Sequence, residues 1–124
     1  MAAELPILDA GALAELLDST GNDVEFVREL IATYLADTPS QLEAMTAAVD
    51  SDDAAALVRP AHTLKSSSAT VGASRLSARA RELEMAGRSG SLQPAVHATV
   101  EAARAEWTAA AAALSTWPDT VPAK

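Results

Sequence analysis

The chain has 124 residues, of which 49% are hydrophobic but only 3% aromatic, with no cysteine and a formal net charge of −8. This length suits one compact domain and has no room for a catalytic domain plus a regulatory one, which disfavours a kinase, a Rossmann enzyme or a receptor. Without cysteine there are no disulfides, thiolate chemistry or Cys-ligated metal centres. The acidic balance disfavours nucleic acid and anionic lipid as partners.

The N-terminal residues and the hydropathy pattern bear on location. Residues 1–4 are acidic where a signal peptide would be basic, and no apolar run approaches the roughly 20 residues of a membrane span. We therefore expect a soluble, cytoplasmic protein that does not bind membranes, and we expect it to be a monomer.

Five stretches with apolar residues at helical spacing predict five helices, and about a quarter of all residues are Ala, the best helix former. The predicted helices run from Asp9 to Ser19, from Asn22 to about Val49, from Asp50 or Ser51 to Gly72, over 73–86, and from Ser91 to about Ser115. Tight turns between them indicate an all-α, up-down-up-down four-helix bundle with a short extra N-terminal helix. We expect one domain over residues 1–124, with a helical core at about 9–116 and short flexible ends.

The second predicted helix has a clear N-terminal capping signal but contains a proline in its interior. Asn22 with Glu25 three residues on predicts its N-cap, and Phe26 and Tyr34 lie on its predicted apolar stripe. Pro39 removes one backbone hydrogen bond, and the residues around it also resemble a fresh helix start. We expect one long kinked helix, because the apolar stripe stays in phase across the proline.

Start and stop signals also bound the later helices. Pro60 should kink or tighten the third helix, and Gly87 and Gly90 are expected to close the fourth. Ser91 is the expected cap of the fifth helix, with Pro94 in its first turn.

Basic residues gather in the middle of the chain. Between Arg59 and Arg88 lie six of the nine basic residues but only two of the seventeen acidic ones. Such a stretch is either a solvated helix face or a site for an anionic group or an acidic partner.

One strip of the third predicted helix combines a histidine, a lysine and small residues; it consists of Val58, His62, Lys65, Ser66 and Ala69. The strip lies about 100° from the core stripe, so the imidazole should lie at the edge of the buried face and be open to water. Lys65 is close enough to pair with an anion carried on the ring, and Ser66 and Ala69 allow another protein to approach closely. This pattern favours a neutral nucleophile that acquires negative charge over a structural histidine.

The run AHTLKSSSA at positions 61–69, followed by VGA at 71–73, Leu76 and LE at 83–84, resembles the signature of histidine phosphotransfer (HPt) domains. The resemblance covers nearly the whole chain. It implies a four-helix bundle that relays phosphoryl groups between aspartates of receiver domains in multistep two-component phosphorelays, without ATP. It also implies that His62 is the phosphorylated residue and Lys65 its electrostatic support.

The resemblance extends to the fourth predicted helix. It implies that Glu84 accepts a hydrogen bond from Nδ1 of His62 and leaves Nε2 free to attack. Arg88, one turn beyond, either assists the phosphate or interacts with the helix dipole. Ser66 stands where the family usually has glycine, and we expect docking of a receiver across Val58, Ser66 and Ala69 to survive this change with partner choice altered.

Other function classes fit less well. An autokinase dimerisation domain would carry an acidic residue where the chain has Thr63, and a carboxylate-bridged metal bundle would need Glu-x-x-His pairs that neither histidine has. We expect His97 to be exposed and structural, and Trp107 to lie in the core. The sequence therefore predicts a phosphoryl carrier that is not an enzyme, has no cofactor or metal, and takes its phosphoryl group from a receiver aspartate or a kinase. A non-catalytic helical adaptor derived from an HPt domain is the alternative.

Overall fold

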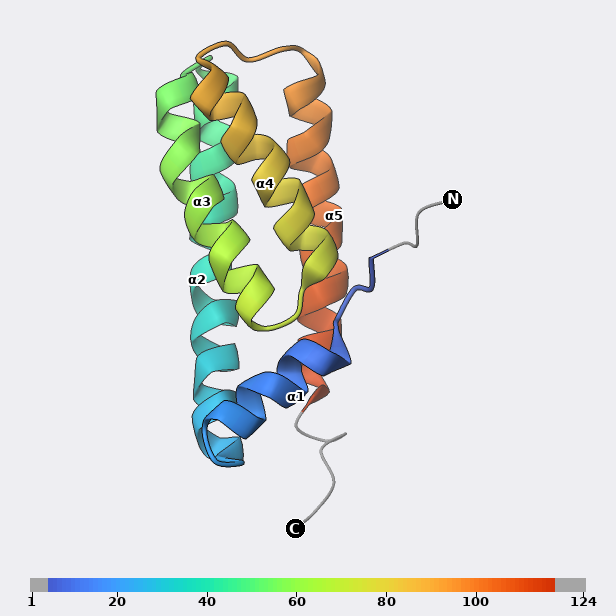
Figure 1. The fold of residues 1–124 in the computed structure, drawn as a ribbon. Helices are drawn as coiled ribbons and strands as arrows, with labels where there is room; N and C mark the ends of the chain where they lie inside the picture. The colour runs from blue at the N-terminus through green and yellow to red at the C-terminus, as the bar shows by residue number, and fades with distance from the viewer. Residues whose placement is uncertain (1–4, 118–124) are drawn as a thin grey trace.

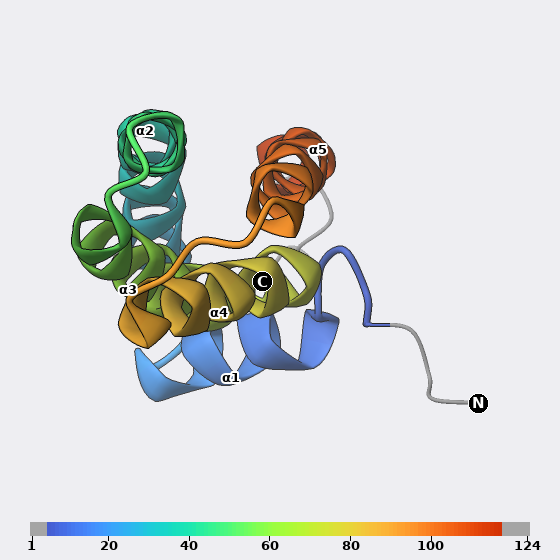
Figure 2. The ribbon, with the colours of Figure 1, turned by 90° about the horizontal axis from the view of Figure 1, so that it is seen from above.

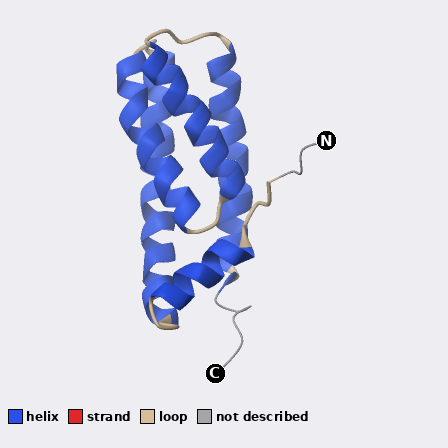
Figure 3. Ribbon diagram, in the orientation of Figure 1, coloured by secondary structure: helices blue, strands red, loops and turns tan. Residues whose placement is uncertain are grey.

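A computed structural model describes residues 5–117, and within that range the chain forms five α-helices and no strand (Figures 1 and 3). The helices are α1 (Ala10–Ser19), α2 (Val24–Asp50), α3 (Ala54–Thr70), α4 (Ser74–Ser89) and α5 (Ala95–Ser115). The last four run alternately up and down, and α1 crosses one end of the bundle, beside α2 and α3 (Figures 1 and 2). The predicted all-α four-helix bundle with a short leading helix is confirmed.

Of the expected short flexible ends, residues 1–4 and 118–124 lie outside the described residues. None of the described helices combines the length and the hydropathy that a bilayer span requires.

The core lies where the bundle helices face one another. The predicted stripe of α3 is buried, with Leu57, Ala61 and Leu64 each at 0% exposure. Val96, Val100, Ala103, Ala110 and Leu114 of α5 are buried as well. The helical period read from the sequence thus gives the correct inner face of both helices.

The inner face of α2 differs from the predicted one near the helix start. Phe26 is 44% exposed, and the buried positions are Val27, Ile31 and Tyr34. This helix carries two apolar stripes, one beginning at Phe26 and the other at Val27. Neighbouring residues of a helix point about 100° apart around its axis, so the two stripes face different directions. Packing against α3 and α5 selects the stripe that begins at Val27 and leaves Phe26 at the surface.

The helix continues through Pro39, as predicted. Thr38 is buried, and its Oγ1 donates a hydrogen bond to the carbonyl of Tyr34 at 2.7 Å, so it is no N-cap. Pro39 has no amide hydrogen to donate to the carbonyl of Leu35, and it lies on the exposed side of the helix.

The predicted cap of α2, Asn22, is wrong by one residue. Asn22 has φ +65°, in the left-handed region, and Asp23 is the N-cap, accepting a hydrogen bond from the amide of Phe26 at 3.0 Å. The chain must reverse after α1, and Asn is one of the few residues that tolerates this turn conformation.

The same arrangement corrects the predicted start of α3. Asp50 is the last residue of α2 and Ser51 its C-cap, so neither caps α3. Asp52 takes the turn conformation, with φ +54°, and Asp53 is the N-cap, accepting from the amide of Ala56 at 3.1 Å.

Two predictions at the junction of α4 and α5 are also corrected. Gly87 does not close α4; it lies buried inside the helix, and Gly90, with φ +80°, is the C-cap. Ser91 does not cap α5, because Pro94 occupies the N-cap position directly before Ala95. Pro94 has φ −54°, which is already helical, and Ser91 is too far along the chain to reach the first amides.

Candidate functional site

His62 of α3 faces Glu84 of the antiparallel helix α4. The side chain of His62 is 54% exposed, so the imidazole lies at the edge of the buried face, as predicted. Its Nδ1 lies 2.9 Å from Oε2 of Glu84. Within residues 5–117, Glu84 is the hydrogen-bond partner of the ring, and Nε2 is left to solvent.

Glu84 is a buried carboxylate with several cationic partners. Its side chain is only 5% exposed. Oε1 lies 2.7 Å from Nζ of Lys65, and Oε2 accepts from Nε and Nη2 of Arg88 at 3.0 and 2.7 Å. A buried charge is tolerated only when it is paired and hydrogen-bonded, and Glu84 meets both conditions.

These partners keep Glu84 ionised. The hydrogen bond from Lys65, followed by that from Arg88, outweighs burial and, with the bond to His62, lowers the pKa of Glu84 to about 2. A carboxylate at this place can only accept, so the proton of a neutral imidazole is held on Nδ1. The lone pair is then on Nε2, the nitrogen that faces solvent.

The charges around the ring leave an excess of one positive charge. Lys65 and Arg88 contribute two, and Glu84 neutralises one of them. Both cations belong to helices that also carry His62 or Glu84, so they stay near the ring. The arrangement therefore suits a nucleophile that receives an anionic group.

The structure brings together the three residues His62, Lys65 and Glu84, and it adds Arg88 to them. Lys65 is expected to support a phosphate, and Arg88 either to assist it or to interact with the helix dipole; in this structure each of the two binds Glu84. Ser77 is a further residue beside the site that the sequence pattern did not indicate; its Oγ donates a hydrogen bond to the carbonyl of Lys65 at 2.9 Å and connects α4 to α3. A small polar residue seven positions before Glu84, on the same helix face, was the available signal.

The other strip residues differ in accessibility. Ser66 and Ala69 are exposed on the same face as His62. Val58 is half-buried, because its methyl group lies against Gly87 of α4.

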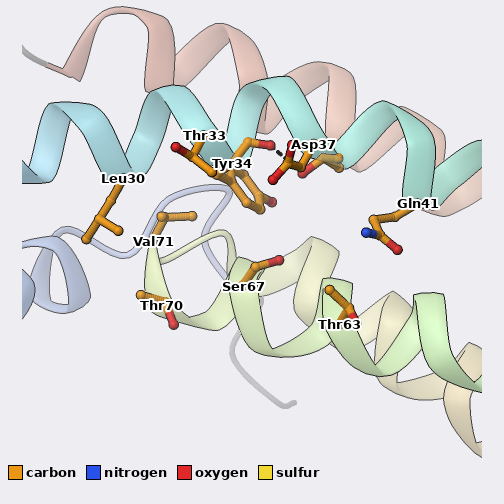
Figure 4. Close-up of a pocket in the computed structure, with 10 residues that line it drawn as sticks. Leu30, Thr33, Tyr34, Asp37, Gln41, Thr63, Ser67, Thr70 and Val71 are labelled. Atoms are coloured by element: carbon orange, nitrogen blue, oxygen red, sulfur yellow. Dashed lines mark hydrogen bonds between the residues drawn. The ribbon is translucent and has the colours of Figure 1, made fainter.

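A groove of about 250 Å³ separates α2 from α3 next to this strip (Figure 4). Thr63, Ser67 and Thr70 line it from α3, and Leu30 and Thr33 are among the lining residues from α2 (Figure 4). Because Thr63 directly follows His62, the groove adjoins the histidine strip.

Tyr34 forms part of the groove wall and connects α2 to α3. Its hydroxyl lies 2.7 Å from Oγ of Ser68 in a buried hydrogen bond, and its ring meets Trp107 edge to face, with 5.5 Å between centroids. Burial raises the pKa of Tyr34 to about 12, so it is a neutral phenol. Trp107 is half-buried against the core, which agrees with its expected packing role.

The second histidine lies away from the site. His97 is exposed, with Nδ1 4.0 Å from Oδ1 of Asp50. No group of three or more side chains suited to hold a metal ion occurs in the described part of the chain.

Comparison with known proteins identifies the family. The Hpt domain family matches residues 29–117. The chain belongs to the Hpt domain family. Histidine phosphotransfer in a two-component phosphorelay, with receiver domains as partners, is therefore its function.

Solved structures resemble this Hpt domain along almost its entire length. The crystal structure of histidine-containing phosphotransfer protein B (HptB) from Pseudomonas aeruginosa PAO1 matches with a TM-score of 0.82 and 28% identity, over 96% of this chain and 100% of that one. The HPT domain of an Hpt sensor hybrid histidine kinase from Shewanella shares the fold, with a TM-score of 0.72 and 18% identity, over 93% and 100% of the two chains. A search of curated proteins gave no match.

Proposed function

We propose that this Hpt domain accepts a phosphoryl group on Nε2 of His62 from the aspartyl phosphate of a receiver domain, or from a kinase, and passes it to the aspartate of another receiver domain. The observation that carries the proposal is the 2.9 Å contact between Nδ1 of His62 and the ionised Glu84, which leaves Nε2 nucleophilic and exposed.

The transfer needs no proton movement on this chain. The lone pair of Nε2 attacks phosphorus in line, the N–P bond forms, and the P–O bond to the aspartyl carboxylate breaks with its electron pair leaving on the carboxylate. The imidazole becomes a cation that still carries its proton on Nδ1. Glu84 stabilises that cation through the same hydrogen bond, and the reverse attack by a second aspartate restores the neutral ring.

In this proposal, Lys65 and Arg88 stabilise the negative charge of the phosphoryl group on His62. Both hold Glu84 before transfer, within 2.7 Å of its oxygens. When the phosphoryl group arrives, its oxygens become additional acceptors for these two cations. Glu84→Ala should leave His62 competent but slower, because a water molecule replaces the lost hydrogen bond only in part.

The test is phosphorylation by a phosphorylated receiver domain carrying a radioactive label. The labelled product should be acid-labile and base-stable, as phosphohistidine is. His62→Gln should abolish labelling, whereas the matched change His97→Gln should leave it unchanged. Label that persists in His62→Gln overturns the assignment. Binding of the receiver by the unaltered chain without any labelling supports the adaptor instead.

We infer that the receiver docks on the exposed part of the strip, Ser66 and Ala69, and on the adjoining α2–α3 groove. A receiver aspartate can reach Nε2 only from this side, because Nδ1 faces α4. Val58 and Arg88 border the same surface from the α4 side. Shape complementarity at such a surface requires short side chains close to the histidine.

Ser66→Arg tests the docking surface. The long side chain should slow transfer from a receiver far more than Ser66→Gly does, while phosphorylation by the small donor phosphoramidate stays unchanged in both variants. Equal transfer rates from the receiver in the two variants would place docking elsewhere.

We further propose that residues 1–124 form one Hpt domain, and that it is a cytoplasmic monomer that carries phosphoryl groups without binding ATP. Light scattering during gel filtration tests the monomer, cell fractionation tests the location, and equilibrium dialysis with labelled ATP tests the absence of nucleotide binding.

A further inference from the structure

Helix α4 lies close against the backbone of α3 at Gly87, three residues after Glu84. A Cβ added to Gly87 would lie 2.8 Å from Cγ2 of Val58 and 2.9 Å from the carbonyl oxygen of Ala54. It would also lie 3.2 Å from the amide nitrogen of Val58. Two of these three atoms are backbone atoms, so side-chain repacking alone cannot accommodate a methyl group, and the helices would have to separate.

This contact lies one turn from the pair that orients the ring. Glu84 and Gly87 share one face of α4, and Val58 and His62 share one face of α3. On the far side of the pair, Ser77 donates to the carbonyl of Lys65 at 2.9 Å. The hydrogen bond between His62 and Glu84 is therefore bracketed by two close contacts of the same helices.

The tolerance of that hydrogen bond is small. At 2.9 Å it lies in the middle of the favourable range, and a few tenths of an ångström of helix separation moves it toward the limit of about 3.2 Å. A glycine inside a helix is also destabilising relative to alanine, so its presence at a buried helical position calls for a packing reason.

We propose that Gly87 is a positioning residue for the phosphoacceptor: by admitting the α3 backbone against α4, it sets the distance at which the Glu84 carboxylate holds Nδ1 of His62. The inference rests on the proposed function for its effect on transfer, but its geometric part concerns only the ring and the carboxylate. The other charged groups at this place are Lys65, which lies on α3 with His62, and Arg88, which lies on α4 with Glu84; both bind the Glu84 oxygens.

The test is the full chain with Gly87→Ala, first checked for folding by its amide NMR spectrum. Nitrogen-15 chemical shifts of the His62 ring report which nitrogen carries the proton. We expect the Nδ1–H tautomer to fall relative to the unaltered chain, and phosphorylation by phosphoramidate to slow by about tenfold. This small donor makes the rate independent of receiver docking.

Ala86→Gly is the matched control. It alters helix propensity at the neighbouring position of α4 without crowding α3, so the tautomer and the rate should stay unchanged. If Gly87→Ala does not fold, Val58→Ala with Gly87→Ala removes the side-chain contact and keeps the backbone one, and the same two readings apply.

A folded Gly87→Ala chain with the tautomer and rate of the unaltered chain overturns the inference. An unaltered chain that is never phosphorylated on His62 refutes the proposed function instead, and the tautomer measurement still decides the role of Gly87.

Discussion

Glu84 is both buried and charged, and its partners compensate for its burial. Its two oxygens accept from Lys65, Arg88 and His62, and its side chain is almost inaccessible to water. Each partner that is removed leaves a carboxylate with less compensation for its burial. The consequences can be measured on Glu84 itself.

Lys65→Ala should raise the pKa of Glu84 from about 2 toward its ordinary value of 4.5, because Lys65 makes the largest favourable contribution. Arg88→Ala should raise it by less. Carbon-13 NMR titration of the Glu84 carboxyl group measures both shifts. An unchanged pKa in Lys65→Ala would show that the ammonium does not bind Glu84 in solution.

The same pKa shift predicts how Glu84 contributes to stability as the pH changes. Its pKa is lower in the folded chain, so its stabilising contribution is complete above about pH 4.5 and is lost as the pH falls toward 2. Glu84→Gln, which cannot ionise, lacks this contribution. The difference in unfolding free energy between the unaltered chain and Glu84→Gln should therefore shrink from pH 5 to pH 2, as urea titrations can show; a difference independent of pH contradicts the prediction.

At the scale of the helices, the caps determine where α2 and α3 begin. Both starts use a residue in the left-handed region followed by an aspartate cap, Asn22 with Asp23 and Asp52 with Asp53. Because α3 carries His62, the cap at Asp53 also stabilises the helix that holds the proposed phosphoacceptor.

Asp53→Ala should lower the free energy of unfolding by about 1 kcal/mol, the usual effect of losing an N-cap side chain. Asp50→Ala is the control and should change it by less than about 0.5 kcal/mol, because this carboxylate and the nearby His97 are both largely exposed. Thermal or urea unfolding of the two variants measures the difference. Equal losses would mean that Asp53 does not cap α3.

At the scale of the whole molecule, helix α3 has two different faces. One packs in the core and stabilises the bundle, and the other carries the histidine proposed to react. Leu64 is completely buried toward the core, whereas His62, two residues earlier, is exposed. A change in the core should therefore affect folding and leave Nε2 of His62, the proposed phosphoryl acceptor, as it is.

Leu64→Ala should cost about 2 to 5 kcal/mol of unfolding free energy, through lost burial and the cavity left behind. This is a large part of the stability of a small domain. At temperatures below its lowered unfolding midpoint, where the variant is folded, it should still be phosphorylated on His62 by phosphoramidate at the rate of the unaltered chain. A slower rate in the folded variant would show that the core and the site are coupled.

The sequence by itself determined the helical content, the inner faces of α3 and α5 and the placement of His62 at the edge of the buried surface. These follow from the helical period, which depends only on local spacing. The motif around His62 also identified the family, since residues 61–69 are contiguous in sequence.

Only the tertiary structure decided which of the two apolar stripes of α2 faces the core and which aspartates cap α2 and α3. It also decided that Lys65 and Arg88 both bind the carboxylate of Glu84, and that Gly87 lies inside α4 against the backbone of α3. These features depend on distances between helices and on the course of the turns. Packing of the whole bundle determines these distances and turns, and they cannot be predicted from the spacing of residues along one helix.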